Sequence, residues 1–165
     1  MYNAQMVIYE AEYQRLTEIC EKLLRDSMAR AVFLVDKVGQ LITSVGQTAN
    51  IDTTSLASLV AGATAATGGL ANLLGEEEFP SHYHQGARDS IYIALIGEQL
   101  ILTIIFDNRS TEGLVRLRVK RAEGDLKRVF SDLSQKASAA AETKNNSLFS
   151  EITDEDIEEL FSDTF

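Results

Sequence analysis

The 165-residue sequence has a single cysteine, Cys20, which excludes a disulfide bond within the chain. Cys20 falls on the apolar face of a helix-like stretch, so we expect a buried structural thiol rather than a reactive one. Basic side chains are also scarce, since 15 Lys and Arg stand against 25 Asp and Glu and the net charge is −10. So acidic a chain lacks the basic surface that nucleic-acid binding requires, and we exclude nucleic acid as a partner.

The sequence also lacks the motifs of nucleotide hydrolysis and of nucleophilic catalysis. It has no GxxxxGK[ST] phosphate-binding loop and no GxSxG nucleophile turn. His82 and His84 alternate on a predicted strand and project to one face, where they could share a metal ion. Without a nearby cysteine or a second ligand pair, two polar residues on an edge strand are the simpler account. We therefore expect no catalytic residues, no cofactor and no metal site.

No targeting signal or membrane span is predicted. The first residues, MYNAQMVIYE, have neither a basic segment nor an apolar run, so they are not a signal peptide and we expect a cytoplasmic protein. Residues 53–75 carry no charge and are long enough to cross a bilayer. They contain only six large aliphatic side chains and are flanked by Asp52 and by Glu76–Glu78, which favours a soluble helix.

The hydrophobic pattern predicts an α+β domain over residues 1–136. Helical spacing is found over residues 9–26, 53–75 and from 111 onward, and β-rich runs occupy 31–36, 40–46, 81–86, 90–97 and 99–107. Asp52 or Thr53 can cap the middle helix, and short turns at 37–39 and 97–98 suit hairpins. The order αββαβββα predicts a five-stranded antiparallel sheet with one helix on one face and two on the other.

The last 29 residues differ from the rest in composition. Residues 137–150 are rich in small and polar side chains and are interpreted as a flexible linker. Residues 151–165 predict a short acidic helix capped by Thr153, with Ile157, Leu160 and Phe161 as apolar contacts. Such a helix cannot bury its apolar face alone, so it packs on its own domain or docks into a basic groove on a partner.

The middle helix has an unusual distribution of side-chain size. One stripe carries the larger groups and is expected to face the sheet: Leu56, Leu59/Val60, Ala63, Ala66/Thr67, Leu70 and Leu73/Leu74. A second face consists of small residues, and each glycine in it costs about 0.5–1 kcal/mol of helix stability relative to alanine. Such a surface lets another backbone approach closely, either another helix of the same chain or a second polypeptide, and we favour the latter. The residues of this face are Ser58, Ala61, Gly62, Ala65, Gly68, Gly69 and Asn72.

Three segments of the sequence resemble the Roadblock/dynein-light-chain family: VDKVGQLITS (35–44), the helix at 52–73, and DNRSTEGLVRLRVKRA (107–122). The segments FLVDKVGQLITS and ATGGLANLLGEEEFP, together with the acidic C-terminal helix, are similar in sequence to the bacterial MglB group of that family. The resemblance implies a homodimer that pairs its middle helices and edge strands. It also implies a 2:1 complex with a Ras-like small GTPase of MglA type, in cell polarity and gliding motility.

The resemblance further implies a GTPase-activating protein that orders the switch regions of its partner without donating an arginine finger. The small-residue face of the middle helix would then contact the GTPase, and Ile157, Leu160 and Phe161 would add a second contact. Arg109, in a strand-to-helix loop, would be structural rather than catalytic. The alternative is a Roadblock scaffold that binds a GTPase or a motor complex without accelerating hydrolysis.

Overall fold

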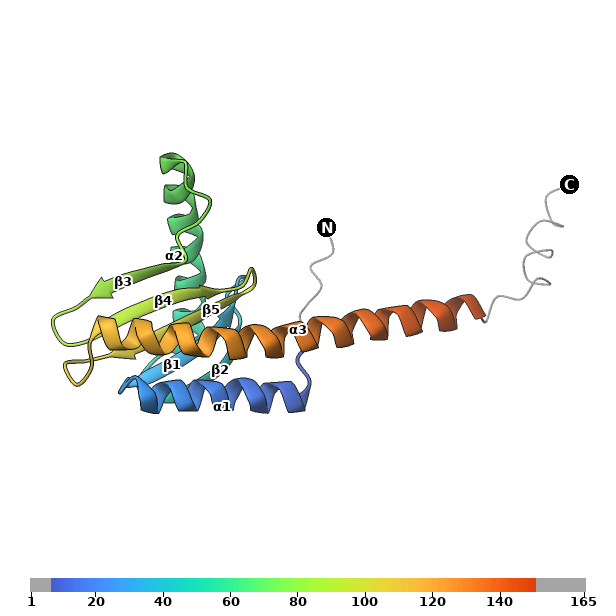
Figure 1. Ribbon diagram of the computed structural model, residues 1–165, viewed down its shortest axis with the longest axis horizontal. Helices are drawn as coiled ribbons and strands as arrows, with labels where there is room; N and C mark the ends of the chain where they lie inside the picture. The colour runs from blue at the N-terminus through green and yellow to red at the C-terminus, as the bar shows by residue number, and fades with distance from the viewer. Residues whose placement is uncertain (1–6, 151–165) are drawn as a thin grey trace, which may run out of the picture. The chain divides into compact units, whose positions relative to one another are not determined.

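One five-stranded antiparallel sheet lies at the centre of the computed structural model, which describes residues 7–150, with side chains to residue 145 (Figure 1). The strand order is β2-β1-β5-β4-β3, so β2 and β3 are the edges. The five predicted strands are confirmed to within one residue at each end. Their bounds are β1 Ala31–Asp36, β2 Leu41–Gly46, β3 Ser81–Gln85, β4 Ser90–Ile96 and β5 Leu100–Phe106.

The central strands are apolar on both faces because helices cover both faces. Every residue of β5 is buried, as are the first five residues of β1. Alternate residues of β1 point to opposite faces, so Ala31, Phe33 and Val35 join a cluster with Ala57 and Val60 of the middle helix. The sheet is therefore the middle layer of three.

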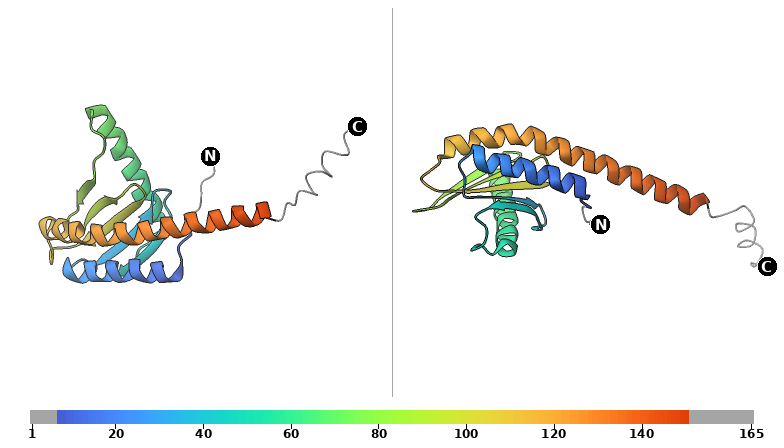
Figure 2. Two further views of the ribbon diagram at one scale, coloured as in Figure 1. Left: turned by 45° about the vertical axis from the view of Figure 1, so that its right-hand side comes forward. Right: turned by 90° about the horizontal axis from the view of Figure 1, so that it is seen from below.

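The helices are α1 (Glu10–Asp26), α2 (Thr53–Leu74) and α3 (Glu112–Ser150). Figure 2 shows α1 and the first part of α3 on one face of the sheet and α2 on the other. A cavity of about 100 Å³ lies between α1 and α3, lined by Leu23 of one helix and Ala122 of the other. Cys20 is completely buried on the inner side of α1, as predicted.

The β1–β2 turn approaches α2 closely through Gly39. This glycine has a φ of +88°, and a Cβ on it would lie 3.2 Å from the Cα of Ser58. A side chain at this position would therefore be strained in its backbone and crowded against the helix. The turn fixes the position of the first half of α2 over the sheet.

Residues 137–150, predicted as a flexible linker, are instead the last part of α3. The composition explains the difference, because ASAAAE contains four alanines, and alanine has the highest helix propensity of all residues. The compact unit that contains the sheet spans residues 8–129. The acidic helix predicted over 151–165, with Ile157, Leu160 and Phe161, lies outside the described residues.

Candidate functional site: the outer face of α2

Both ends of α2 are fixed by local structure. The carboxylate of Asp52 accepts hydrogen bonds from the backbone N–H of Ser55, at 3.0 Å, and from its hydroxyl, at 2.7 Å. These bonds lower the pKa of Asp52, and they confirm the predicted cap. Gly75 ends the helix in a left-handed conformation with a φ of +75°. Between these ends the helix has no charged side chain.

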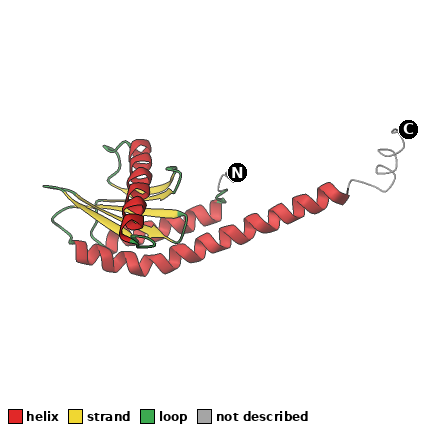
Figure 3. Cartoon of the chain, turned by 90° about the horizontal axis from the view of Figure 1, so that it is seen from above, coloured by secondary structure: helices red, strands yellow, loops and turns green. Residues whose placement is uncertain are grey.

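Only one side of α2 packs against the rest of the chain. Ala57, Val60 and Ala71 are its buried residues, and the first two contact the sheet cluster. Figure 3 shows α2 crossing the direction of the strands, so that a limited length of the helix lies over the sheet. The small side chains of Ala57 and of Ala31 on β1 allow a close approach there.

Leu56 and Val60 pack against the sheet cluster as predicted, but the other leucines of α2 do not face the sheet, and that part of the sequence interpretation was wrong. The exposed fractions are 73% for Leu59, 57% for Leu70, 82% for Leu73 and 73% for Leu74. The reason is the crossing angle, because a helix that runs across the strands cannot bury a stripe along its whole length. The exposed leucines instead lie beside the small residues.

We call this surface the outer face of α2. Its residues recur at helical spacing, all are exposed and none is charged; they are Ser58, Leu59, Gly62, Ala65, Ala66, Gly69, Leu70 and Leu73. A helix exposed to water normally carries Lys and Glu on such a face. Large exposed apolar surfaces are often sites of contact with another molecule.

The glycines of α2 have no packing role inside the described chain. A Cβ built on Gly62, Gly68 or Gly69 would meet nothing within 4 Å. Of the predicted contact residues, five are exposed (Ser58, Gly62, Ala65, Gly69 and Asn72), while Ala61 and Gly68 are partly buried. These glycines therefore serve no packing contact within residues 7–150, although each costs helix propensity.

The partly buried small residues line a hollow of about 430 Å³ between α2 and the β4–β5 hairpin. Ala61, Ala65 and Gly68 form its wall on the helix side. Three carboxylates, those of Glu77, Glu78 and Glu98, surround it together with a single lysine, Lys37. The outer face of α2 thus continues into a hollow with a mainly acidic rim.

By length and composition, α2 is also the one helix among the described residues that could cross a membrane. It is uncharged over 22 residues, and most of it is not buried in the structure. Its first turns are packed on the sheet through Ala57 and Val60. Length and composition alone do not establish a membrane span.

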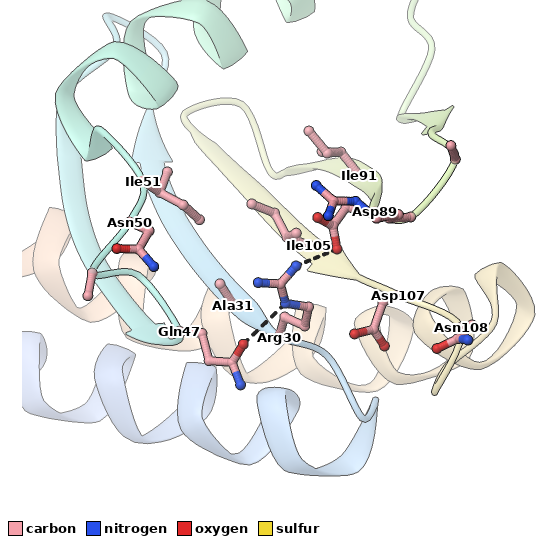
Figure 4. A pocket seen from close by; sticks show the side chains of 13 residues that line it. Arg30, Ala31, Gln47, Asn50, Ile51, Asp89, Ile91, Ile105, Asp107 and Asn108 are labelled. Atoms are coloured by element: carbon pink, nitrogen blue, oxygen red, sulfur yellow. Dashed lines mark hydrogen bonds and ion pairs between the residues drawn. The ribbon is translucent and has the colours of Figure 1, made fainter.

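A larger cavity, of about 1050 Å³, opens where β1 begins and β5 ends (Figure 4). The guanidinium of Arg30 donates to Asp89 at 2.5 Å and to Gln47 at 3.2 Å, and Ile91 and Ile105 also line the cavity. Sequence reasoning missed this cavity because its polar residues come from separate loops. No Ser, Cys or His side chain is among the described residues that line it.

Arg109 is held by its own loop. Its Nε donates to both carboxylate oxygens of Asp107, at 3.0 and 3.2 Å, and this pairing lowers the pKa of Asp107. The side chain is about half exposed. It therefore extends along its loop rather than outward as a free cation.

The two histidines lie on the edge strand β3, and His82 is the more buried of the two. Burial and the neighbouring His84 lower the pKa of His82, so this ring is neutral at pH 7. Among the described residues there is no cluster of three or more His, Cys, Asp or Glu side chains that could hold a metal ion.

The fold and the apolar helix surface define a class of protein, and the chain belongs to the Roadblock/LC7 domain family, whose model matches residues 15–106. It is similar to Myxococcus xanthus MglB, with 55% sequence identity and a TM-score of 0.73, over 77% of this chain and 96% of that chain. It is also similar to the gliding protein MglB of Thermus thermophilus, with 36% identity and a TM-score of 0.73, over 79% and 99% of the two chains.

A further MglB structure, described as having a tetrameric arrangement, shares 35% identity and a TM-score of 0.75 over 80% of this chain and 99% of that one. The Roadblock/LC7 domain of Streptomyces avermitilis, at 9% identity and a TM-score of 0.64 over 69% and 96% of the chains, shares the fold alone. No curated protein sequence matches the chain. The predicted family and its MglB-like character are confirmed.

Proposed function

We propose that this protein is a homodimeric regulator of a Ras-like small GTPase of MglA type, and that it accelerates GTP hydrolysis by its partner in the cytoplasm. The observation that carries the proposal is the outer face of α2, an exposed and uncharged surface on a chain similar to MglB. In this proposal two copies associate through α2, and the paired helices receive one GTPase molecule, with a role in cell polarity and gliding motility.

The small residues at the edge of this face are the proposed contacts of the GTPase. Ala61, Ala65 and Gly68 open into the hollow whose rim carries Glu77, Glu78 and Glu98. An acidic rim suits basic side chains of a partner and speeds their encounter. Close approach of the GTPase backbone at Ala65 would let the contact restrain a mobile switch segment.

The proposed mechanism is positioning of the partner's own catalytic groups. An arginine finger must reach out of its own protein into the active site of another, where it raises the rate by about 10³–10⁵-fold. Arg109 is instead ion-paired with Asp107 in its own loop. Ordering of the GTPase switch regions requires only shape and polar complementarity from this chain.

Ala65→Arg tests the contact surface. A long charged side chain at this exposed helix position should prevent close approach and abolish the stimulation of single-turnover GTP hydrolysis. Ala11→Arg is the matched control, because Ala11 is an exposed alanine on α1, and it should retain full stimulation. Circular dichroism verifies that both variants are folded. Unchanged stimulation of hydrolysis by the Ala65→Arg variant would exclude this face as the contact with the GTPase. If the unaltered protein binds the GTPase but does not accelerate hydrolysis, the protein is a scaffold.

Arg109→Ala tests the mechanism. Because Arg109 is proposed to be structural, the stimulation of hydrolysis by the variant should fall by less than about tenfold. Removal of an arginine finger would instead reduce the rate by about 10³–10⁵-fold. The measurement is single-turnover hydrolysis at saturating concentrations of the protein. A loss in the arginine-finger range would show that the guanidinium acts directly on the transferred phosphoryl group.

A further inference from the structure

A groove runs between α1 and α3, on the opposite face of the sheet from α2 (Figure 2). It joins the cavity of about 100 Å³ beside Leu23 to a second hollow of about 240 Å³, since Ile19 and Asp125 line both. Apolar side chains of both helices line it: Ile19, Leu23, Ala122 and Val129. The proposed contact between two α2 helices lies on the other face of the sheet, so it leaves this α1–α3 groove open.

The α1–α3 groove is basic, although the chain as a whole is acidic. Its charged residues are the cations Arg15, Lys22, Arg118, Arg121 and Arg128 and the carboxylates Glu18, Asp26 and Asp125. Asp125 is already paired with Arg128. Among the residues that the structure describes, Lys22, Arg118 and Arg121 form no ion pair, so their charges are available to a ligand.

Arg118 is held in the wall of the groove. Its side chain is partly buried, and its Nε is shielded from solvent and forms no hydrogen bond. A guanidinium held in this way has lost part of its rotamer freedom before a ligand arrives, so less is lost on binding. A carboxylate on its terminal nitrogens would supply the counter-charge that the described residues do not provide.

We propose that the α1–α3 groove binds the acidic segment 151–165 of a second copy of this chain. The segment has seven acidic side chains and no basic one, and Ile157, Leu160 and Phe161 recur at helical spacing. Its charge matches the cations of the groove, and its apolar stripe matches the apolar lining, as in helix-in-groove recognition. The lengths agree too, because residues 15–26 of α1 span about 17 Å and a helix over 153–163 would span about 15 Å.

The second copy is required because the segment is too short to reach the groove of its own chain. The groove ends at Val129, and α3 continues without interruption to Ser150, a rise of about 32 Å. Residues 151–165 would span about 22 Å as a helix, and the seven residues up to Ile157 about 25 Å when extended. The contact does not depend on whether the chain regulates a GTPase, although a GTPase that binds the segment would compete with it.

Amide hydrogen exchange of the full chain, measured by mass spectrometry, tests the contact at the segment itself. At low salt, exchange of residues 151–165 should slow by about tenfold as the protein concentration rises from about 1 µM to about 1 mM, because a contact between copies follows mass action. The double variant Arg118→Gln with Arg121→Gln should remove this slowing. The matched control is Lys120→Gln with Lys127→Gln, which removes two exposed charges from the opposite side of α3 and should keep the slowing.

Exchange of β1 and β5 in the same samples verifies that both double variants are folded. An equal effect of the two double variants on the slowing would overturn the groove as the site. Slowing that does not change with protein concentration would overturn the contact between copies and place the segment on its own chain. Exchange of residues 151–165 as fast as in an unfolded peptide at every concentration would overturn the contact altogether.

Discussion

At the scale of single residues, two glycines with left-handed backbones differ in their surroundings. Gly46 has a φ of +90° and Gly97 a φ of +61°. A Cβ at Gly46 would lie 2.4 Å from the carbonyl oxygen of Arg30 and 2.9 Å from a methyl group of Leu24, whereas at Gly97 it would meet nothing within 4 Å. Both positions restrict the backbone, but only the first also lacks space.

Gly97→Ala should therefore lower the free energy of unfolding by about 1–2 kcal/mol, which is the cost of a left-handed alanine. Gly46→Ala should lower the free energy of unfolding by a clearly larger amount, because the carbonyl group of Arg30 must also move. Urea unfolding of both variants measures the difference, provided that their m-values agree. Equal losses would mean that the backbone at Gly46 shifts without cost.

Residue-level predictions succeeded where the cause is local. Asp52 or Thr53 was predicted to cap α2, and Asp52 does so by accepting hydrogen bonds from Ser55. Cys20 was predicted to be buried because it lies on an apolar stripe. Burial raises the pKa of its thiol to about 12, so the thiol is inert at neutral pH. In both cases a few neighbouring residues determine the result.

At the scale of whole elements, the sequence predicted which helices and strands form but not how far each is covered. The apolar stripe of α2 was assigned to the sheet, yet Leu59, Leu70 and Leu73 are exposed. Periodicity identifies an apolar face but does not say whether the same chain or another one covers it. Similarly, the alanines of residues 137–141 were taken as a linker, although alanine favours a helix.

The exposed end of α2 leads to a prediction about self-association. Leu73 is 82% exposed, so Leu73→Lys should leave the thermal stability of the isolated chain nearly unchanged. It should weaken association between copies, because a charge would enter the proposed contact between two α2 helices. Sedimentation equilibrium measures the association constant. Leu117→Lys, at an exposed leucine of α3, is the matched control, and an equal effect of both variants would contradict the contact.

At the scale of the whole molecule, the family follows from the sequence but the surfaces do not. The order of elements and three quoted motifs were enough to predict the Roadblock fold, which the family match and the strand order confirm. The cavity beside Arg30 and the hollow beside Ala65 depend on side chains from several loops and strands. Such juxtapositions are produced by tertiary packing, and no local pattern encodes them.

Charge is distributed unevenly along the chain, and this leads to a prediction about the C-terminal segment. Residues 151–165 carry seven acidic side chains and no basic one, out of a net charge of −10 for the whole chain. In the proposed complex this segment docks on a basic groove of the GTPase through Ile157, Leu160 and Phe161. Its contribution should then have an electrostatic part, which salt screens, and an apolar part, which salt leaves intact.

A chain ending at residue 150 should bind the GTPase more weakly than the full chain does. The difference in affinity between the two chains should narrow as the salt concentration rises, because the Debye length shrinks from about 10 Å at 0.1 M to about 3 Å at 1 M. Replacing Leu160 and Phe161 with alanine keeps every acidic side chain. This double variant should lose affinity by a similar factor at low and at high salt. Fluorescence anisotropy of the labelled GTPase measures all three proteins. If the shortened chain binds as tightly as the full chain at low salt, the segment does not contact this partner, and α2 alone forms the interface.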